Sequence, residues 1–192
     1  MSSGRTEIAP ERFDGWLRHR LLEHPEALVE VDGSLTTVRW DGGGARCQAF
    51  RYDPLGVVLI RRGGYAVGLA RAGTLVEAKT GRRHVQGRTA AGGWSQQRFA
   101  RRRENQTDAL VEAVAGHVER ILVKGAGGIP AALVVGGDRA LVAALLAEAT
   151  CRAVRDLPRR ELPDLPDPDA TVLADALRRG RSVWIVPLAE SN

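Results

Sequence analysis

The spacing of apolar residues predicts a helix followed by a set of short strands. Residues 10–23 carry apolar side chains at helical spacing, and Pro10 suits the first turn of such a helix. The apolar face consists of Phe13, Trp16, Leu17 and Leu21, and Leu22 can extend it. After this helix, apolar and polar residues alternate in short runs separated by turns rich in glycine and aspartate, which is typical of an antiparallel meander. The runs cover residues 27–31, 36–40, 47–52, 57–62, 65–70 and 75–79.

The second half of the chain alternates between helical and strand patterns. A long amphipathic segment predicts a helix from Gln96 to about Val123, which the glycines at 125–128 end. Asp138 suits the N-cap of a further helix. The remaining patterns predict strands over 131–135, 151–157 and 182–188, and helices over 139–149 and 170–179.

Together these patterns predict an α/β protein with one mixed α+β sheet, which begins as antiparallel strands and is flanked by helices. A chain of 192 residues is long enough for one good core, or for one core with a small appendage. We therefore expect a single domain over residues 10–192. We expect residues 1–9 to form a disordered N-terminal tail.

Composition narrows the class of protein. The chain has a formal net charge of +5 and a pI near 10.0, and it lacks an apolar stretch long enough to span a membrane. Cys47 and Cys151 lie far apart and the histidines are scattered, so neither a disulfide framework nor a zinc site is indicated. We expect a soluble, cytoplasmic protein that needs no metal ion and no cofactor.

Residues 81–103, the basic stretch, concentrate the positive charge. This segment holds seven arginines and one histidine and no acidic residue, and Gly92-Gly93 lies near its centre. Such a charge pattern on a glycine-containing loop indicates contact with a polyanion, most simply a nucleic-acid backbone. Trp94 can stack on a base. The RNA-binding candidates are Arg82, Arg83, His84, Arg88, Trp94, Arg98, Arg101, Arg102 and Arg103.

The position of four of these arginines strengthens the interpretation. Arg98 and Arg101–Arg103 fall in the first turns of the predicted helix, where the helix dipole disfavours cations. A bound phosphate would reverse this effect, because helix N-termini and guanidinium groups both attract anions. The alternative is a solvated basic face without a ligand.

The sequence does not match the motifs of three other kinds of catalytic site. Gly93-Trp94-Ser95 could open a GxSxG nucleophile motif, but Gln97 stands where the second glycine belongs. The glycines at 125–128 follow Lys124 instead of preceding a Gly-Lys-Ser/Thr, so they do not form a phosphate loop. A metal-dependent nuclease needs clustered carboxylates. The candidate acids are scattered along the sequence: Asp41, Asp53, Glu77, Asp138 and Asp156.

The glycine loop that ends in glutamine resembles the catalytic loop of the release-factor clade, which frees nascent peptide from tRNA on the ribosome. Termination factors of eukaryotes and archaea carry a Gly-Gly-Gln tip. The ribosome-quality-control peptidyl-tRNA hydrolases of the Vms and ankyrin/zinc-finger type carry Gly-x-x-Gln, which Gly93-Trp94-Ser95-Gln96 matches. The resemblance implies an RNase H-like catalytic domain and a bacterial stand-alone version, without ankyrin repeats, zinc finger or codon-reading domain.

The resemblance also implies a site and its partners. Gln96, Gly93 and Gly92 would be the catalytic residues, and Gln97 is a second candidate for the tip glutamine. The substrate would be peptidyl-tRNA on the large ribosomal subunit, and the protein would act as a monomer with water as its only co-reactant. The alternative is a non-catalytic RNA-binding or ribosome-associated factor that uses the same basic loop.

The chemistry of an amide side chain agrees with such a role. A glutamine cannot act as a general base at neutral pH, so it must act through geometry. Its carbonyl can accept a hydrogen bond from a water molecule, while an N–H group donates to the developing oxyanion. Glycines allow the loop backbone to adopt positive φ and to approach RNA closely.

Overall fold

The computed structural model describes residues 4–82 and 94–188, and for residues 94–100, 102 and 103 it describes the backbone alone. Within these ranges the chain forms two compact units. The first unit combines residues 1–51 with 178–192, and the second comprises residues 52–177. We expected one domain over residues 10–192, and it remains a prediction that the two units fold as one.

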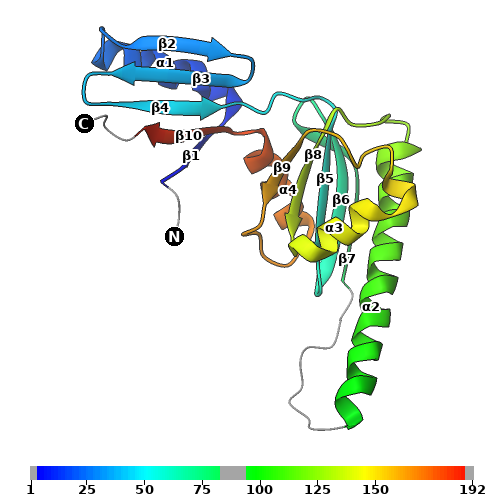
Figure 1. Ribbon diagram of the computed structural model, residues 1–192. Coiled ribbons are helices and arrows are strands. Elements are labelled where there is room, and N and C mark those ends of the chain that lie inside the picture. Colours follow the sequence, from blue (N-terminus) through cyan, green and yellow to red (C-terminus); the bar gives the residue numbers. More distant parts are fainter. Residues whose placement is uncertain (1–3, 83–93, 189–192) are drawn as a thin grey trace. The chain divides into compact units, whose positions relative to one another are not determined.

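The first unit is an antiparallel sheet with a helix on one face. The strand order is β1-β10-β4-β3-β2 (Figure 1). The elements are β1 (Thr6–Ile8), α1 (Pro10–Glu23), β2 (Leu28–Asp32), β3 (Leu35–Trp40), β4 (Gly43–Gln48) and β10 (Val183–Leu188). Phe13, Trp16 and Leu17 of α1 belong to the same core cluster as Cys47 and Ile185 of the sheet. The helical spacing of apolar residues thus predicted the buried face of α1, except that Leu22 is exposed.

Residues 6–8 differ from the expected disordered tail. They form β1, which pairs with β10 in antiparallel register. The Glu7 carboxylate accepts a hydrogen bond from Arg179 Nε at 3.1 Å and another from Arg5 Nη2 at 2.9 Å. These charge-assisted hydrogen bonds hold β1 in place. The pairing also places β10 between β1 and β4, so the last strand belongs to the first unit.

The second unit is built on a mixed sheet with the order β7-β6-β5-β8-β9. Its strands are β5 (Leu55–Arg61), β6 (Gly64–Arg71), β7 (Thr74–Arg82), β8 (Ala132–Gly137) and β9 (Arg159–Leu162). The first three form an antiparallel meander, whereas β8 and β9 join parallel to β5. The expected α/β class, with antiparallel leading strands and flanking helices, is confirmed. The strands form two sheets instead of one, because β4 pairs with β3 and β10 whereas β5, the next strand along the chain, pairs with β6 and β8.

Helices pack on both faces of the mixed sheet. They are α2 (Trp94–Val118), which continues as a π-helical turn over Glu119–Val123, α3 (Arg139–Ala147) and α4 (Ala170–Arg181). The helices α2 and α3 share a core with Val58, Val67 and Val135 on one face of the sheet. On the other face, Leu173 of α4 lies against Gly68. Both faces of β5 and β6 are therefore buried, which explains their nearly continuous apolar sequence.

The helix α3 begins where the sequence predicted. The Asp138 carboxylate accepts hydrogen bonds from the backbone N–H groups of Ala140 at 2.9 Å and Leu141 at 3.3 Å. Losing such an N-cap typically costs about 1 kcal/mol. The cap therefore fixes the point at which the chain leaves β8 and enters α3.

The strand predicted over residues 151–157 was wrong. The chain there forms a 3-10 turn over Ala149–Cys151 and further turns, and the strand follows at β9. The Arg155 side chain stabilises the turns, because its guanidinium donates to the carbonyls of Leu146 and Ala147 at 2.6 Å and of Glu148 at 3.0 Å. Cys151 and Val154 are buried, and their spacing of three residues fits a turn better than a strand.

A tyrosine–histidine pair joins α2 to the sheet. The Tyr65 hydroxyl lies 2.9 Å from His117 Nε2, and the two ring centroids are 5.2 Å apart. Burial lowers the pKa of His117, and the charges of Arg120 and Lys79 lower it further. A neutral imidazole can accept the tyrosine hydrogen bond and an imidazolium cannot. Packing and electrostatics therefore favour the same neutral state of His117.

We expect the free energy of unfolding to decrease as the pH falls below 6.5, the ordinary pKa of histidine. The pKa of His117 is lower in the folded chain, so the unfolded chain binds the proton first and gains stability from it. His117→Gln should reduce this pH dependence in denaturant unfolding followed by circular dichroism. His19→Gln, which changes an exposed histidine, is the control. An unchanged pH dependence in His117→Gln would contradict the assignment.

Candidate nucleic-acid interface

The two halves of α2 differ in burial. In its second half, Leu110, Val114 and Val118 are completely buried in the core of the second unit. In its first half, the side chains of Arg101, Glu104 and Asp108 are exposed. Figure 1 shows this half extending past the end of the sheet. We call residues 94–109 the projecting segment.

Sequence explains why the projecting segment leaves the body of the unit. Residues 101–108 are all charged or polar, so this part of α2 has no apolar face to bury. At a rise of 1.5 Å per residue, the start of α2 lies about 24 Å along the helix axis from Leu110. The first turn of α2 is therefore held far from the sheet.

Strand β7 leads into the basic stretch from the other side. Its last residue, Arg82, is exposed and lies opposite Gly64 of β6. A Cβ atom at Gly81 would lie 2.5 Å from the Tyr65 ring, so the strand can pass this ring only with glycine at that position. The exposed side chains of Lys79 and Arg82 place positive charge at the end of β7.

Both candidate glutamines belong to a helix in the structure. Gln96 and Gln97 lie in the first turn of α2, which begins at Trp94, two residues earlier than expected. Gly92 and Gly93 come directly before this turn and lie outside the described residues, as do Arg83, His84 and Arg88. The glycine–glutamine motif thus includes the point where α2 begins.

The start of α2 has a positive electrostatic environment. Its first turn contains no acidic residue, and its unpaired backbone N–H groups carry the positive end of the helix dipole. Arg98, Arg102 and Arg103 lie on the helical backbone of the projecting segment, and the Arg101 side chain is exposed. These features can bind phosphate groups.

The carboxylates of a metal-dependent nuclease would have to cluster, but three of the candidate acids form hydrogen bonds at separate places in the fold. Asp53 accepts a hydrogen bond from the Ala72 N–H at 2.8 Å, Glu77 accepts one from Arg120 at 2.8 Å, and Asp138 caps α3. In the part of the chain that the structure describes, no group of three His, Cys, Asp or Glu residues could hold a metal ion.

None of the described helices is long and apolar enough to cross a membrane.

One pocket of the second unit was not predicted from the sequence. A pocket of about 410 Å³ lies between α3 and β9, and charged side chains line it, among them Arg139, Arg159 and Glu161. These residues belong to no sequence motif, and about twenty positions separate the first from the others. An indication was available in Arg159 and Glu161, which alternate with the buried Arg160 and Leu162.

Comparison with known proteins places the chain in a family. A family model for the Actinobacteria/Chloroflexi VLRF1 release factor matches residues 53–186. The matched range includes nearly all of the second unit, with the basic stretch and both candidate glutamines. A search among curated proteins finds no match. Because the family model covers more than half of the sequence, the chain belongs to the Actinobacteria/Chloroflexi VLRF1 release factor family.

Proposed function

We propose that this protein is a peptidyl-tRNA hydrolase, which releases nascent peptide from tRNA on the large ribosomal subunit. The family match carries the proposal, because it identifies a release-factor-type domain over residues 53–186. The motif Gly93-Trp94-Ser95-Gln96 at the start of a projecting helix supports it. The finer resemblance to the Vms and ankyrin/zinc-finger clade is part of the same proposal.

The geometry of α2 suits a site that is enclosed by RNA. A helix of about 10–12 Å diameter can enter a channel that a folded domain cannot enter. The projecting segment would carry Gln96 into this channel while the rest of the second unit stays outside. The exposed Arg101, together with Arg98, Arg102 and Arg103, would contact RNA phosphates along the way.

Gln96 would act by positioning one water molecule. The water oxygen attacks the ester carbonyl that joins peptide to tRNA, and the bond from this carbon to the ribose oxygen breaks. The ribose oxygen takes up one proton of the water, which leaves a tRNA with a free hydroxyl and a peptide with a carboxylic acid, and this acid then loses the second proton to solvent. The Gln96 carbonyl would orient the water, and an N–H group would stabilise the oxyanion.

The two glutamines would have different roles. Successive residues of an α-helix differ by about 100° around the axis, so Gln96 and Gln97 cannot point at the same group. Gln96 completes the Gly-x-x-Gln spacing and lies closer to the glycines. We therefore assign the water-positioning role to Gln96.

We expect Gln96→Ala to reduce the rate of peptide release about 10²–10³-fold, as the loss of one transition-state hydrogen bond usually does. Gln96→Glu should also fail, because a carboxylate repels the oxyanion and lacks the amide donor. Gln97→Ala is the matched control and should retain most of the activity. The measurement is release of labelled peptide from ribosome-bound peptidyl-tRNA.

The same assay separates the alternatives. Activity that depends on Gln97 but not on Gln96 would move the assignment by one residue. A protein that binds ribosomes but releases no peptide, with or without these substitutions, would be the non-catalytic RNA-binding factor.

We expect combined reversal of Arg101, Arg102 and Arg103 to glutamate to weaken ribosome association without unfolding the chain. The salt dependence of binding should also decrease, by about one unit of logarithmic slope for each phosphate that an arginine no longer neutralises. Reversal of Arg12, Arg18 and Arg46, which are exposed in the first unit, makes the same change in net charge and is the control. Equally weakened binding in both variants would indicate a general charge effect and contradict a specific interface.

A further inference from the structure

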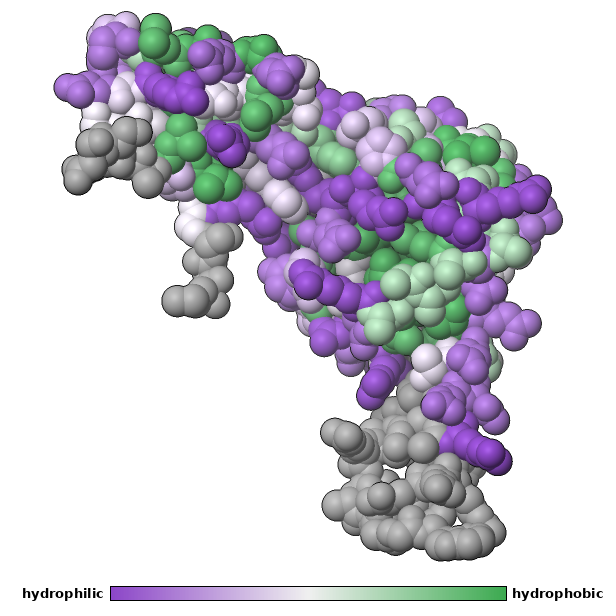
Figure 2. Space-filling model, in the orientation of Figure 1, coloured by the Kyte–Doolittle hydropathy of each residue, from purple (hydrophilic) through white to green (hydrophobic). Residues whose placement is uncertain are grey.

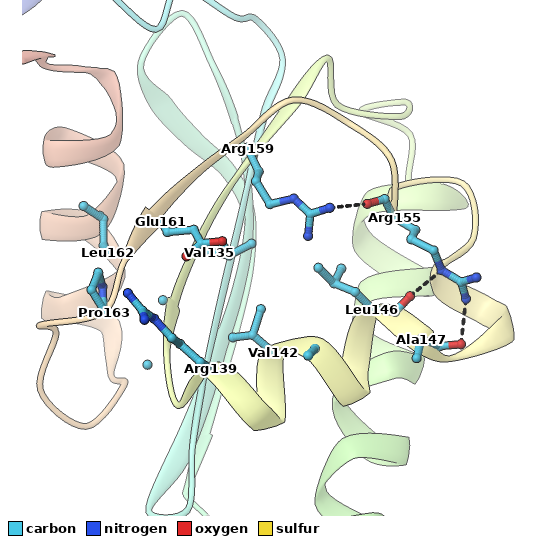
Figure 3. Close-up of a pocket in the computed structure, with 13 residues that line it drawn as sticks. Val135, Arg139, Val142, Leu146, Ala147, Arg155, Arg159, Glu161, Leu162 and Pro163 are labelled. Atoms are coloured by element: carbon cyan, nitrogen blue, oxygen red, sulfur yellow. Dashed lines mark hydrogen bonds between the residues drawn. The ribbon is translucent and has the colours of Figure 1, made fainter. Parts of the chain in front are cut away.

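The pocket beside α3 has an apolar wall and a charged rim. Val142, Ala143 and Leu146 of α3 line one side, and Val135 of β8 lies at its base (Figure 3). Figure 2 shows an apolar area over the position of α3, bordered by hydrophilic residues. The volume of about 410 Å³ lies in the range of small-molecule sites, which is roughly 300–1,000 Å³.

The pocket exists because an edge strand lacks a covering helix. Along β9, Arg160 and Leu162 are buried, whereas Arg159 and Glu161 are exposed and line the pocket. On the side that faces the pocket, β9 therefore presents charged side chains, and a helix would pack there only on an apolar surface. Since β9 is the last strand of the mixed sheet, the space between it and α3 stays open.

Arginines from three segments surround this space. Arg139 is the first residue of α3, Arg155 belongs to the turns before β9, and Arg159 begins β9. The Arg155 guanidinium already donates hydrogen bonds to three backbone carbonyls. Arg159 Nη2 donates to the Arg155 carbonyl at 3.1 Å. Arg139 is exposed, and Figure 3 shows it extending from α3 toward Pro163. With Glu161 as the one carboxylate among the lining residues, the rim has a surplus of two positive charges.

The pocket runs along the whole of β9. Gly136, Gly137 and Leu162 line it at the carboxyl ends of β8 and β9, and Arg155 and Arg159 line it at the amino end of β9. Arg139 follows Asp138, whose carboxylate already accepts hydrogen bonds from the first N–H groups of α3, so the Arg139 side chain and not the helix N-terminus would attract an anion here.

We propose that this pocket binds a purine nucleoside diphosphate or triphosphate, with guanine as the preferred base. Arg139 and Arg159 would bind the phosphates, because arginine matches phosphate oxygens in charge and geometry. The base would lie against Val142 and Leu146. Glu161 would accept hydrogen bonds from the N1–H and the 2-amino group of guanine.

Charge and hydrogen bonding distinguish this ligand from simpler ones. Inorganic phosphate would leave the apolar wall uncovered and would be repelled by Glu161. A peptide with a carboxyl terminus brings one negative charge against a surplus of two, whereas a diphosphate brings more than one. Adenine offers Glu161 one amino group, and guanine offers two adjacent N–H donors. This inference does not depend on the hydrolase proposal.

The test is isothermal titration of the full-length protein with GDP, ADP and pyrophosphate. We expect GDP to bind more tightly than ADP, and ADP more tightly than pyrophosphate. Glu161→Gln should remove the preference for GDP over ADP, because the amide no longer accepts from both donors. Binding of the three probes with equal affinity would indicate a plain anion site and overturn the nucleotide assignment.

Substitutions locate the site. Arg139→Ala and Arg159→Ala should each weaken GDP binding by about tenfold or more, as the loss of a charge-assisted hydrogen bond does. Arg152→Ala, which removes an exposed arginine outside the pocket, should leave the affinity unchanged. Thermal unfolding of each variant verifies the fold. No binding of GDP to the folded wild type, or equal binding by wild type and both pocket variants, would overturn the proposal.

Discussion

Burial of the second half of α2 is the interaction on which the rest of the second unit depends. Leu110, Val114 and Val118 are fully inaccessible, and each such side chain contributes about 1.5–3 kcal/mol when it leaves water. An isolated polar helix shorter than about 12–15 residues is marginal in water. The buried half supplies the nucleus from which the projecting segment extends, so the position of Gln96 depends on contacts far along the helix.

Strand order determines where the two candidate sites lie. Because β7, β5, β8 and β9 run in the same direction, their carboxyl ends meet at one end of the mixed sheet. The basic stretch leaves from β7 at one edge of this sheet, and the pocket adjoins β9 at the other edge. Four strand spacings of about 4.8 Å separate the two edges by about 19 Å. The two candidate sites therefore lie at opposite edges of the sheet and share no residues.

Local sequence patterns predicted most helices and strands. The features that depend on contacts between distant parts of the chain could not be predicted. The spacing of apolar residues in α1 and the cap at Asp138 each depend on nearby residues and agree with the structure. Alternation located five of the six leading strands, but the run predicted over 47–52 was wrong, since the strand there is β4 at Gly43–Gln48. The division into two sheets could not be predicted, because it depends on which strand pairs with β10 from the far end of the chain. The turns at 149–157 were missed because the guanidinium of Arg155 stabilises them, and short apolar runs do not reveal such contacts. The basic stretch needed no tertiary information, whereas the pocket combines residues that are adjacent only after folding.

The place of β10 has a consequence for the order in which the chain folds during synthesis. The first unit needs residues 183–188 between β1 and β4, whereas the second unit is continuous in sequence. A growing chain can therefore complete the later unit while the earlier one still lacks a central strand. The usual N-to-C order of domain folding is reversed. Until β10 emerges, the facing edges of β1 and β4 have no partner strand, and this interval is the one in which the nascent chain most needs protection from aggregation.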